Sequence, residues 1–258
     1  MLTKPLMHQY NMKCINNPNL PQKRVGEVAI SADAKAAIAT LNEIGIKTVE
    51  ILPDKRFPEP VKSHSDLQLL HFGNNIILSH KEQTIKENEL TDFTFIKIND
   101  IPHSIYPNDV KLNCAIIGNK IICNKKTIAN EILELAEKLN YKIINTNQGY
   151  TKCSICVVNE NAIITDDKSI FTAAGNYFDD VLFISKNSIQ LSGYNYGFIG
   201  GCCGKIDKDK IAFNGAIESH IDYKKIIDFL KRNNVECVEL HKDILVDIGG
   251  ILPLMEIE

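Results

Sequence analysis

The feature that most limits how this chain can fold is a short apolar segment that recurs five times. Each copy has three mostly apolar residues followed by Ser, Asn or Asp, and successive copies start roughly 45 residues apart. A run of this length is typical of a buried strand, and the polar residue that follows favours a turn or a helix start. A repeat of this period is typical of propellers and other closed repeat folds. The five copies are Val28–Ser31, Ile76–Ser79, Ile121–Asn124, Ile163–Asp166 and Ile211–Asn214.

The segments between the copies alternate between helical and strand patterns. Ser31 is expected to cap a first helix that runs to about Ile44, with Gly45 ending it. Each helix is followed by a strand, and hairpins around short turns complete the unit. The sequence predicts helices over 31–44, 126–140 and 220–233, strands over 46–51, 93–98, 141–144 and 235–240, and hairpins over 67–78 and 153–164.

Two incomplete units indicate how the chain closes. The first copy has no hairpin partner before it, and the last unit, 216–258, has no final copy. An N-terminal strand that completes the last unit would leave no exposed sheet edge. We therefore predict an α/β fold, a five-unit α/β propeller spanning residues 26–258 as one domain. The alternative is an open doubly wound sheet, which the recurring hairpins disfavour. Three prolines predict that residues 1–25 form an irregular arm.

Composition excludes several classes of protein. With 258 residues, 44% hydrophobic, and a net charge of −3, the chain resembles an ordinary globular protein without a nucleic-acid or membrane partner. No apolar run reaches the length of a membrane span or a signal peptide. The eight cysteines are therefore expected to be reduced thiols in a cytoplasmic protein. Nothing in the sequence sets an oligomeric state.

In a closed repeat fold, the loops that lead into the five hairpins converge at one end of the axis. These loops occupy 63–66, 107–114, 149–154, 197–204 and 243–250. They contain more chemically active side chains than structural loops need. The candidate site residues are His64, Asp66, Asn113, Lys152, Cys153, Cys203 and Asp247.

Three of these motifs resemble the pentein superfamily of guanidine-modifying enzymes. The sequence His64-Ser65-Asp66 leads into an apolar hairpin, Cys153 enters a later hairpin after the polar loop that begins at Gly149, and Asp247 precedes a Gly pair. The resemblance implies a five-unit α/β propeller. Penteins usually carry the nucleophilic Cys in the final unit, whereas two units follow Cys153 here. The resemblance therefore implies a circularly shifted order of units.

The same resemblance implies the chemistry of a cysteine-dependent hydrolase. Cys153 would attack the C–N carbon of a small guanidino or amidino compound and form a covalent thiouronium intermediate. Its thiolate would be held ionised beside Lys152 or be formed on substrate binding. His64 would act as acid and base. In an extended segment Asp66 would point to the same side as His64 and grip the guanidinium.

Asp247 would supply a second carboxylate, and Asn113, Lys152 and Cys203 would contact the substrate. No metal or cofactor is required, because thiolate, imidazole and carboxylate suffice.

Other interpretations remain open. Cys203, in a Gly-rich stretch, is a rival nucleophile, and Cys153 could be a core residue. The Cys153-x-x-Cys156 spacing is discounted as a zinc site, because a strand turns the two thiols to opposite faces. Amidinotransfer is less favoured than hydrolysis. A catalytically silent pentein that only binds, like the ribosome anti-association factor, is favoured by the lack of an Arg-Asp motif. His71, His80 and Lys205 are expected to be solvated.

Overall fold

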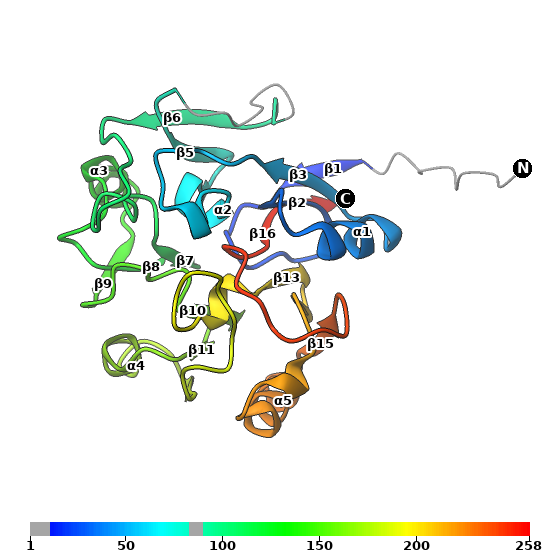
Figure 1. The fold of residues 1–258 in the computed structure, drawn as a ribbon. Helices are drawn as coiled ribbons and strands as arrows, with labels where there is room; N and C mark the ends of the chain where they lie inside the picture. The colour runs from blue at the N-terminus through cyan, green and yellow to red at the C-terminus, as the bar shows by residue number, and fades with distance from the viewer. Residues whose placement is uncertain (1–10, 83–89) are drawn as a thin grey trace, which may run out of the picture.

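The chain folds into an α/β structure with five small, separate sheets, shown by a computed structural model that describes residues 11–82 and 90–258 (Figure 1). Among these residues, no sheet closes on itself as a barrel would. The first sheet contains β1 (Met12–Cys14), β16 (Leu252–Ile257), β2 (Val25–Ser31) and β3 (Lys47–Ile51), and the second contains β4 (Leu69–Gly73), β5 (Ile76–His80) and β6 (Thr94–Ile98). The third contains β7 (Ala115–Ile117), β8 (Lys120–Cys123) and β9 (Lys142–Asn145), and the fourth contains β10 (Ile155–Asn159), β11 (Ala162–Thr165) and β12 (Asp180–Phe183). The fifth contains β13 (Cys203–Asp207), β14 (Lys210–Phe213) and β15 (Glu236–Glu239).

All five sheets share one strand arrangement. A central strand pairs antiparallel with one neighbour and parallel with the strand that follows it in the chain. The central strands β2, β5, β8, β11 and β14 contain the first three residues of each of the five repeated segments. The prediction of one repeated strand per unit is therefore confirmed.

The first sheet joins residues 12–31 to the C-terminal segment. The C-terminal strand β16 pairs antiparallel with β2 on one side and with β1 on the other. The N-terminal strand that contains Val28–Ser31 thus pairs with a strand from the other end of the described chain. Met12–Cys14 was expected to belong to an irregular arm, and that expectation was wrong, because these residues add the edge strand β1.

The longer helices lie at the periphery of the molecule in Figure 1. Gly45 ends the first of them with a φ of +82°, a left-handed conformation that glycine adopts without strain. Ser31 does not cap this helix, because it is the last residue of β2 and the helix starts four residues later. The helices are α1 (Lys35–Glu43), α2 (Ser65–Gln68), α3 (Asn130–Lys138), α4 (Lys168–Ala174) and α5 (Tyr223–Arg232), with 3-10 turns η1 (Glu59–Val61), η3 (Ile199–Gly201) and η4 (Ile217–Ser219).

Hydrophobic side chains pack between neighbouring sheets. One cluster joins the first and second sheets, and others join the second to the third, the third to the fourth and the fourth to the fifth. A further cluster joins the fifth sheet back to the first, with Ala212 of β14 packed among residues of β2 and α1. Every sheet therefore has a neighbour on both faces.

This packing explains why the repeated segments are apolar at consecutive positions. Successive side chains of a strand point to opposite faces of the sheet. In β8, Ile121 and Cys123 pack toward the second sheet, whereas Ile122 packs toward the fourth. A strand covered on one face only would have alternated apolar and polar residues instead.

Three side chains expected to be solvated are buried. His71 and His80 lie within the sheet formed by β4 and β5, and Lys205 lies on β13. The Lys205 ammonium donates hydrogen bonds to the carbonyls of Val158 and Lys208. These two bonds provide acceptors for the buried ammonium group in place of water. These positions were misjudged because hairpin residues were taken as exposed, although both sheet faces are covered.

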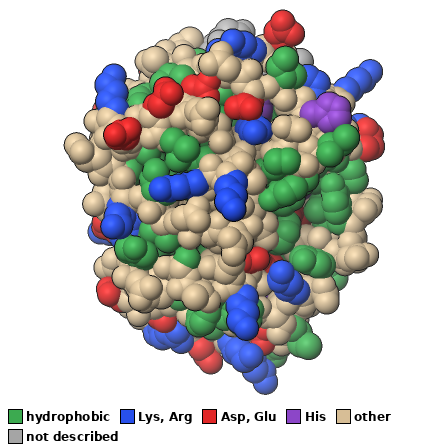
Figure 2. Space-filling model, turned by 90° about the vertical axis from the view of Figure 1, so that its left-hand side faces the viewer, with side chains coloured by type: hydrophobic (Ala, Val, Ile, Leu, Met, Phe, Trp, Pro, Cys, Tyr) green, Lys and Arg blue, Asp and Glu red, His purple; other side chains and the backbone are tan. Residues whose placement is uncertain are grey.

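The surface shows no single sign of charge. On the face shown in Figure 2, acidic and basic side chains are interspersed, which agrees with a net charge of −3. Within the described ranges, no helix is both long and apolar enough to pass through a bilayer.

Candidate active site

The five loops that precede the hairpins contribute residues to one place in the structure. His64 stands just before α2 and β4, Asn113 before β7, Cys153 before β10, Phe198 before β13, and Asp247 before β16. Hydrogen bonds or ion pairs connect them from loop to loop. The convergence expected from the repeat thus brings together segments far apart in the sequence.

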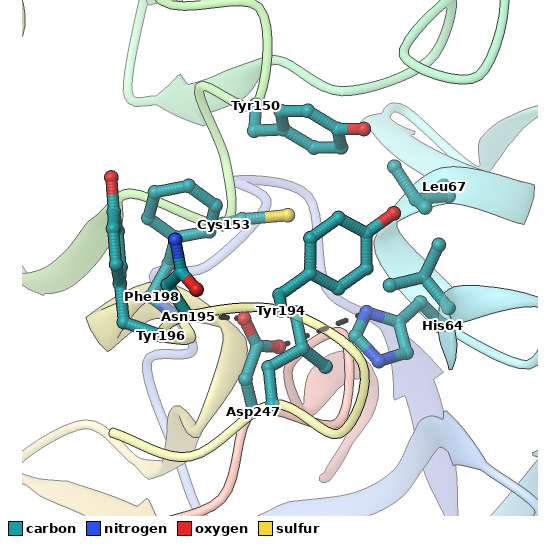
Figure 3. A pocket seen from close by; sticks show the side chains of 11 residues that line it. His64, Leu67, Tyr150, Cys153, Tyr194, Asn195, Tyr196, Phe198 and Asp247 are labelled. Atoms are coloured by element: carbon teal, nitrogen blue, oxygen red, sulfur yellow. Dashed lines mark hydrogen bonds and ion pairs between the residues drawn. The ribbon is translucent and has the colours of Figure 1, made fainter. Parts of the chain in front are cut away.

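A cavity of about 200 Å³ lies among four of these loops (Figure 3). The Cys153 sulfur points into it, and His64 and Asp247 line the same space. The remaining lining is largely aromatic or aliphatic. The lining residues are Val61, His64, Leu67, Tyr150, Cys153, Leu191, Tyr194, Asn195, Tyr196, Phe198 and Asp247.

The Cys153 thiol is buried and hydrogen-bonded on its inner side. It donates to Oδ2 of Asp66 at 3.0 Å and accepts from Nδ2 of Asn113 at 3.2 Å. Burial raises the pKa of this thiol well above its usual range, and the Asp66 and Asp247 carboxylates raise it further. The resting site therefore holds a thiol. Lys152 does not keep it ionised, which leaves deprotonation on substrate binding as the route to the thiolate.

Asn113 fixes the loop that carries the thiol. Its side-chain oxygen accepts the backbone N–H of Lys152 at 2.7 Å, while its amide nitrogen donates to the Asp66 carbonyl at 3.1 Å and to the Cys153 sulfur. The side chain is fully buried and does not line the cavity. Asn113 therefore positions the thiol and is not placed to touch a bound substrate, contrary to the expected contact.

Asp66 lies behind the thiol. The sequence placed it in an extended segment beside His64, but a helical turn over Ser65–Gln68 begins directly after His64, so the alternation of an extended segment does not apply. Asp66 consequently faces a smaller cavity of about 20 Å³ that Lys152 and His71 also line. Burial raises the pKa of Asp66 to about 7, although the Lys152 charge opposes this. Its Oδ1 atom has no hydrogen-bond partner among the described residues.

His64 faces the Asp247 carboxylate. Nδ1 of His64 lies 3.7 Å from Oδ1 of Asp247, and burial lowers the pKa of the imidazole, so the ring is neutral near pH 7. Asp247 is held in turn by the backbone N–H groups of Phe198, at 2.9 Å, and Gly249, at 3.0 Å. This arrangement orients the carboxylate toward both the imidazole and the cavity.

Glycines make room for this pair. Gly249 has a φ of +74°, and a Cβ atom there would lie 2.4 Å from the Cβ of His64. A Cβ on Gly201 would lie 2.0 Å from Oδ1 of Asp247. Both positions allow an approach that any larger residue would block.

Two expected substrate contacts lie away from the cavity. The Lys152 ammonium approaches the Gly200 carbonyl at 3.4 Å on the inner side of the loop. Cys203 is buried in β13, opposite Phe213 of β14, and does not line the cavity. The cavity therefore exposes Cys153, and the rival thiol is part of the packing between sheets.

The aromatic wall was missed from the sequence. Tyr150 and Phe198 stack with ring centroids 6.0 Å apart, and Tyr196 meets Phe198 edge to face at 5.7 Å. Burial and the Asp109 carboxylate, which accepts the phenol's hydrogen bond, raise the pKa of Tyr150. The signal available was Tyr194-Asn195-Tyr196-Gly197-Phe198, a dense aromatic cluster in a loop without a regular period.

Metal ligands are not grouped in the part of the chain that the structure describes: no three His, Cys, Asp or Glu side chains there are placed to hold one ion. The groups hydrogen-bonded around Cys153 are the Asp66 carboxylate and the Asn113 amide.

Comparison with known families adds a classification. A family described as a family of unknown function, DUF6873, matches residues 29–252. The chain belongs to DUF6873. No curated protein matches the sequence of this DUF6873 member.

Solved structures resemble this DUF6873 fold at low identity. The inosamine-phosphate amidinotransferase from Streptomyces griseus is 10% identical, with a TM-score of 0.61, and the match covers 94% of this chain and 97% of that one. DDAH from Pseudomonas aeruginosa, complexed with citrulline, is also 10% identical, with a TM-score of 0.53 and coverage of 88% and 96%. Both are pentein superfamily members. The predicted resemblance to penteins is confirmed at the level of the fold.

Proposed function

We propose that this chain is a cysteine-dependent hydrolase that cleaves a C–N bond of a small guanidino or amidino compound. The observation that carries the proposal is that the Cys153 thiol, the His64 imidazole and the Asp247 carboxylate line one cavity. The similar solved structures include an amidinotransferase and a protein bound to citrulline, which supports guanidino chemistry on this fold.

The proposal includes a five-unit propeller as the scaffold. Five sheets of the same strand arrangement support it, as does the hydrophobic cluster that joins the fifth sheet to the first. In such a ring, the five hairpin loops meet at one end and can share one site. The circular shift of unit order relative to other penteins is part of the same proposal.

The cavity suits a planar cation. Aromatic faces attract guanidinium and amidinium groups, and Tyr150, Phe198 and Tyr194 supply such faces. The carboxylates of Asp247 and, behind the thiol, Asp66 provide the opposite charge. A bound cation beside Cys153 offsets these two carboxylates, which lowers the pKa of the thiol and produces the nucleophile on binding.

His64 accepts and donates the protons that move in the proposed reaction. On substrate binding, the Cys153 proton passes to His64, and the thiolate forms a C–S bond with the guanidine carbon. His64 returns the proton to the departing amine as the C–N bond breaks, which leaves a thiouronium on Cys153. His64 then takes a proton from water as the water oxygen bonds to the same carbon. The C–S bond breaks, the hydroxyl proton of the product passes to the sulfur, and His64 releases its proton to solvent.

Trapping the intermediate tests the nucleophile. We expect acid quenching of a reaction with n-butylguanidine to leave a covalent adduct on Cys153, detectable by intact-mass and peptide mass spectrometry. Cys153→Ala should form no adduct and release no urea product, whereas Cys203→Ala, which removes a thiol outside the cavity, should still form it.

Turnover by Cys153→Ala would show that another group is the nucleophile. Binding of n-butylguanidine without any turnover by the wild-type protein would identify a silent binding protein instead.

A further inference from the structure

The side chains that line the cavity of the candidate active site indicate which kind of non-reacting substituent the substrate has. Resting on the proposed function, we propose that the preferred substrates are guanidino compounds whose substituent is apolar and bears no carboxylate. A guanidino acid, and an amino acid in particular, is then a poor ligand for this site.

The first observation is the composition of the wall. Beyond His64, Cys153 and Asp247, the cavity is lined by aliphatic side chains, aromatic rings and Asn195. Val61 and Leu67 belong to one hydrophobic cluster, and Leu191 and the Tyr150 ring pack against it. A substituent that leaves the reacting end thus meets apolar surface, and its burial there is favourable.

The second observation is that Lys152 and Arg56, two nearby cations, bind other groups of the protein. Neither Arg nor Lys is among the described residues that line the cavity. The Lys152 ammonium is buried against the Gly200 carbonyl on the far side of the thiol loop. Arg56 binds Asp54 through its Nε atom at 3.0 Å.

Lys186 lies against the aromatic wall. Its Nζ atom lies over the Tyr196 ring, 5.5 Å from the centroid, and its charge acts on the buried Asp166. It is not a lining residue of the cavity. Lys186 is therefore a cation to test as a receptor for a carboxylate at the outer edge of the cavity.

The third observation is that the hydrogen-bond donors of Tyr194, Asn195 and Tyr196 in the lining belong to uncharged side chains. The Tyr150 hydroxyl donates to Asp109, so it is engaged outside the cavity. Asp247 is the one Asp, Glu, Lys or Arg side chain among the described residues that line the cavity, while behind the thiol the Asp66 carboxyl is accompanied by the Lys152 ammonium. A carboxylate brought into the cavity would lose its hydration without a cationic partner in the lining and would be repelled by Asp247.

The test compares two ligands that differ in one group: n-butylguanidine and 4-guanidinobutanoate. Calorimetric titration of Cys153→Ala measures binding without turnover. We expect n-butylguanidine to bind at least tenfold more tightly, and wild-type kcat/KM to follow the same order. Equal or tighter binding of 4-guanidinobutanoate would overturn the inference but leave the proposed function standing. If neither compound binds, the proposed function itself fails.

Variants of one wall residue sharpen the test. Leu191 lines the cavity and is half-buried, so an arginine there has room to direct its head toward the ligand. We expect Leu191→Arg in the Cys153→Ala background to narrow or reverse the preference, and Leu191→Met, of similar size but uncharged, to keep the original order. A preference for the acid that disappears in Lys186→Met would assign Lys186 as its receptor and overturn the inference.

Discussion

At the scale of single residues, the site is built around a thiol that its surroundings keep protonated. Asp66 accepts its hydrogen bond, Asn113 donates to its sulfur, and Asp247 adds negative charge. A reactive cysteine usually lies next to positive charge. Here the positive charge would come from the ligand, which makes reactivity depend on the charge of whatever occupies the cavity.

Chloroacetamidine and chloroacetamide, which differ in charge, should therefore label Cys153 at different rates. We expect the cationic amidine to alkylate Cys153 at least tenfold faster at pH 7.5, because it brings the charge that lowers the pKa of the thiol. Asn113→Ala should slow this reaction and move its pH profile upward, since the hydrogen bond from Asn113 lowers the pKa of Cys153. Peptide mass spectrometry gives the rates. Equal labelling by the two reagents would contradict ligand-assisted ionisation.

Asp66 should make stability depend on pH. Its pKa is raised by burial to about 7, so between pH ~4 and ~7 the native state binds more protons than the unfolded chain. The contribution of this carboxyl to the free energy of unfolding falls as pH rises through that window. Asp66→Asn should therefore stabilise the protein at pH 8, by roughly 4 kcal/mol at most, and by less than half as much at pH 5.

Urea denaturation at the two pH values measures this difference. Asp179→Asn, an exposed neighbour of β12, is the matched control and should change stability little at either pH. A stability gain from Asp66→Asn that is the same at pH 5 and pH 8 would contradict the raised pKa.

At the scale of elements, the turn before β16 decides where the imidazole sits. Gly249→Ala places a Cβ against His64 at a φ that disfavours side chains. We expect a loss of about 1–3 kcal/mol in the free energy of unfolding and a larger proportional loss of thiouronium formation. Gly175→Ala at the end of α4 is the control, because a Cβ there meets nothing closer than 3.6 Å. Normal activity in Gly249→Ala would contradict the proposed role of His64 in the reaction.

The elements also show what the sequence could predict. The central strands were predictable because both of their faces are buried, so their residues are apolar at consecutive positions. The direction of Asp66 was not, since a single helical turn in α2 reverses it and four residues carry no periodic signal. Asn113 and Cys203 were placed at the cavity because their loops converge there, but only tertiary packing decides which side chains face inward. The aromatic wall lies in a loop, where periodicity gives no guidance.

At the scale of the whole molecule, residues 11–14 meet the C-terminal residues in the first sheet. Met12 pairs with Ile257, and the backbone N–H of Glu258 donates to the Asn11 carbonyl at 3.0 Å. Joining residues 258 and 11 by a short linker should therefore cost little. Opening the chain instead between Gly175 and Asn176, an exposed turn, should give a folded protein that chloroacetamidine still labels at Cys153.

Circular dichroism and the labelling rate measure the outcome. The matched permutant, opened between Ile163 and Ile164 inside the buried central strand β11, should fail to fold. If the permutant opened at 175 failed as well, the pairing of β16 with β1 and β2 would not be sufficient to hold the permuted chain in its fold.

The hairpin loops that carry His64, Asn113, Cys153, Phe198 and Asp247 each precede a different sheet, while the sheets are held by clusters that none of these five side chains joins. The candidate site residues therefore lie in the loops before the sheets, and the residues that pack the sheets together lie elsewhere. Because hydrogen bonds and an ion pair link the five loops, a substitution in one of them is expected to shift its neighbouring loops while the packing between sheets is kept.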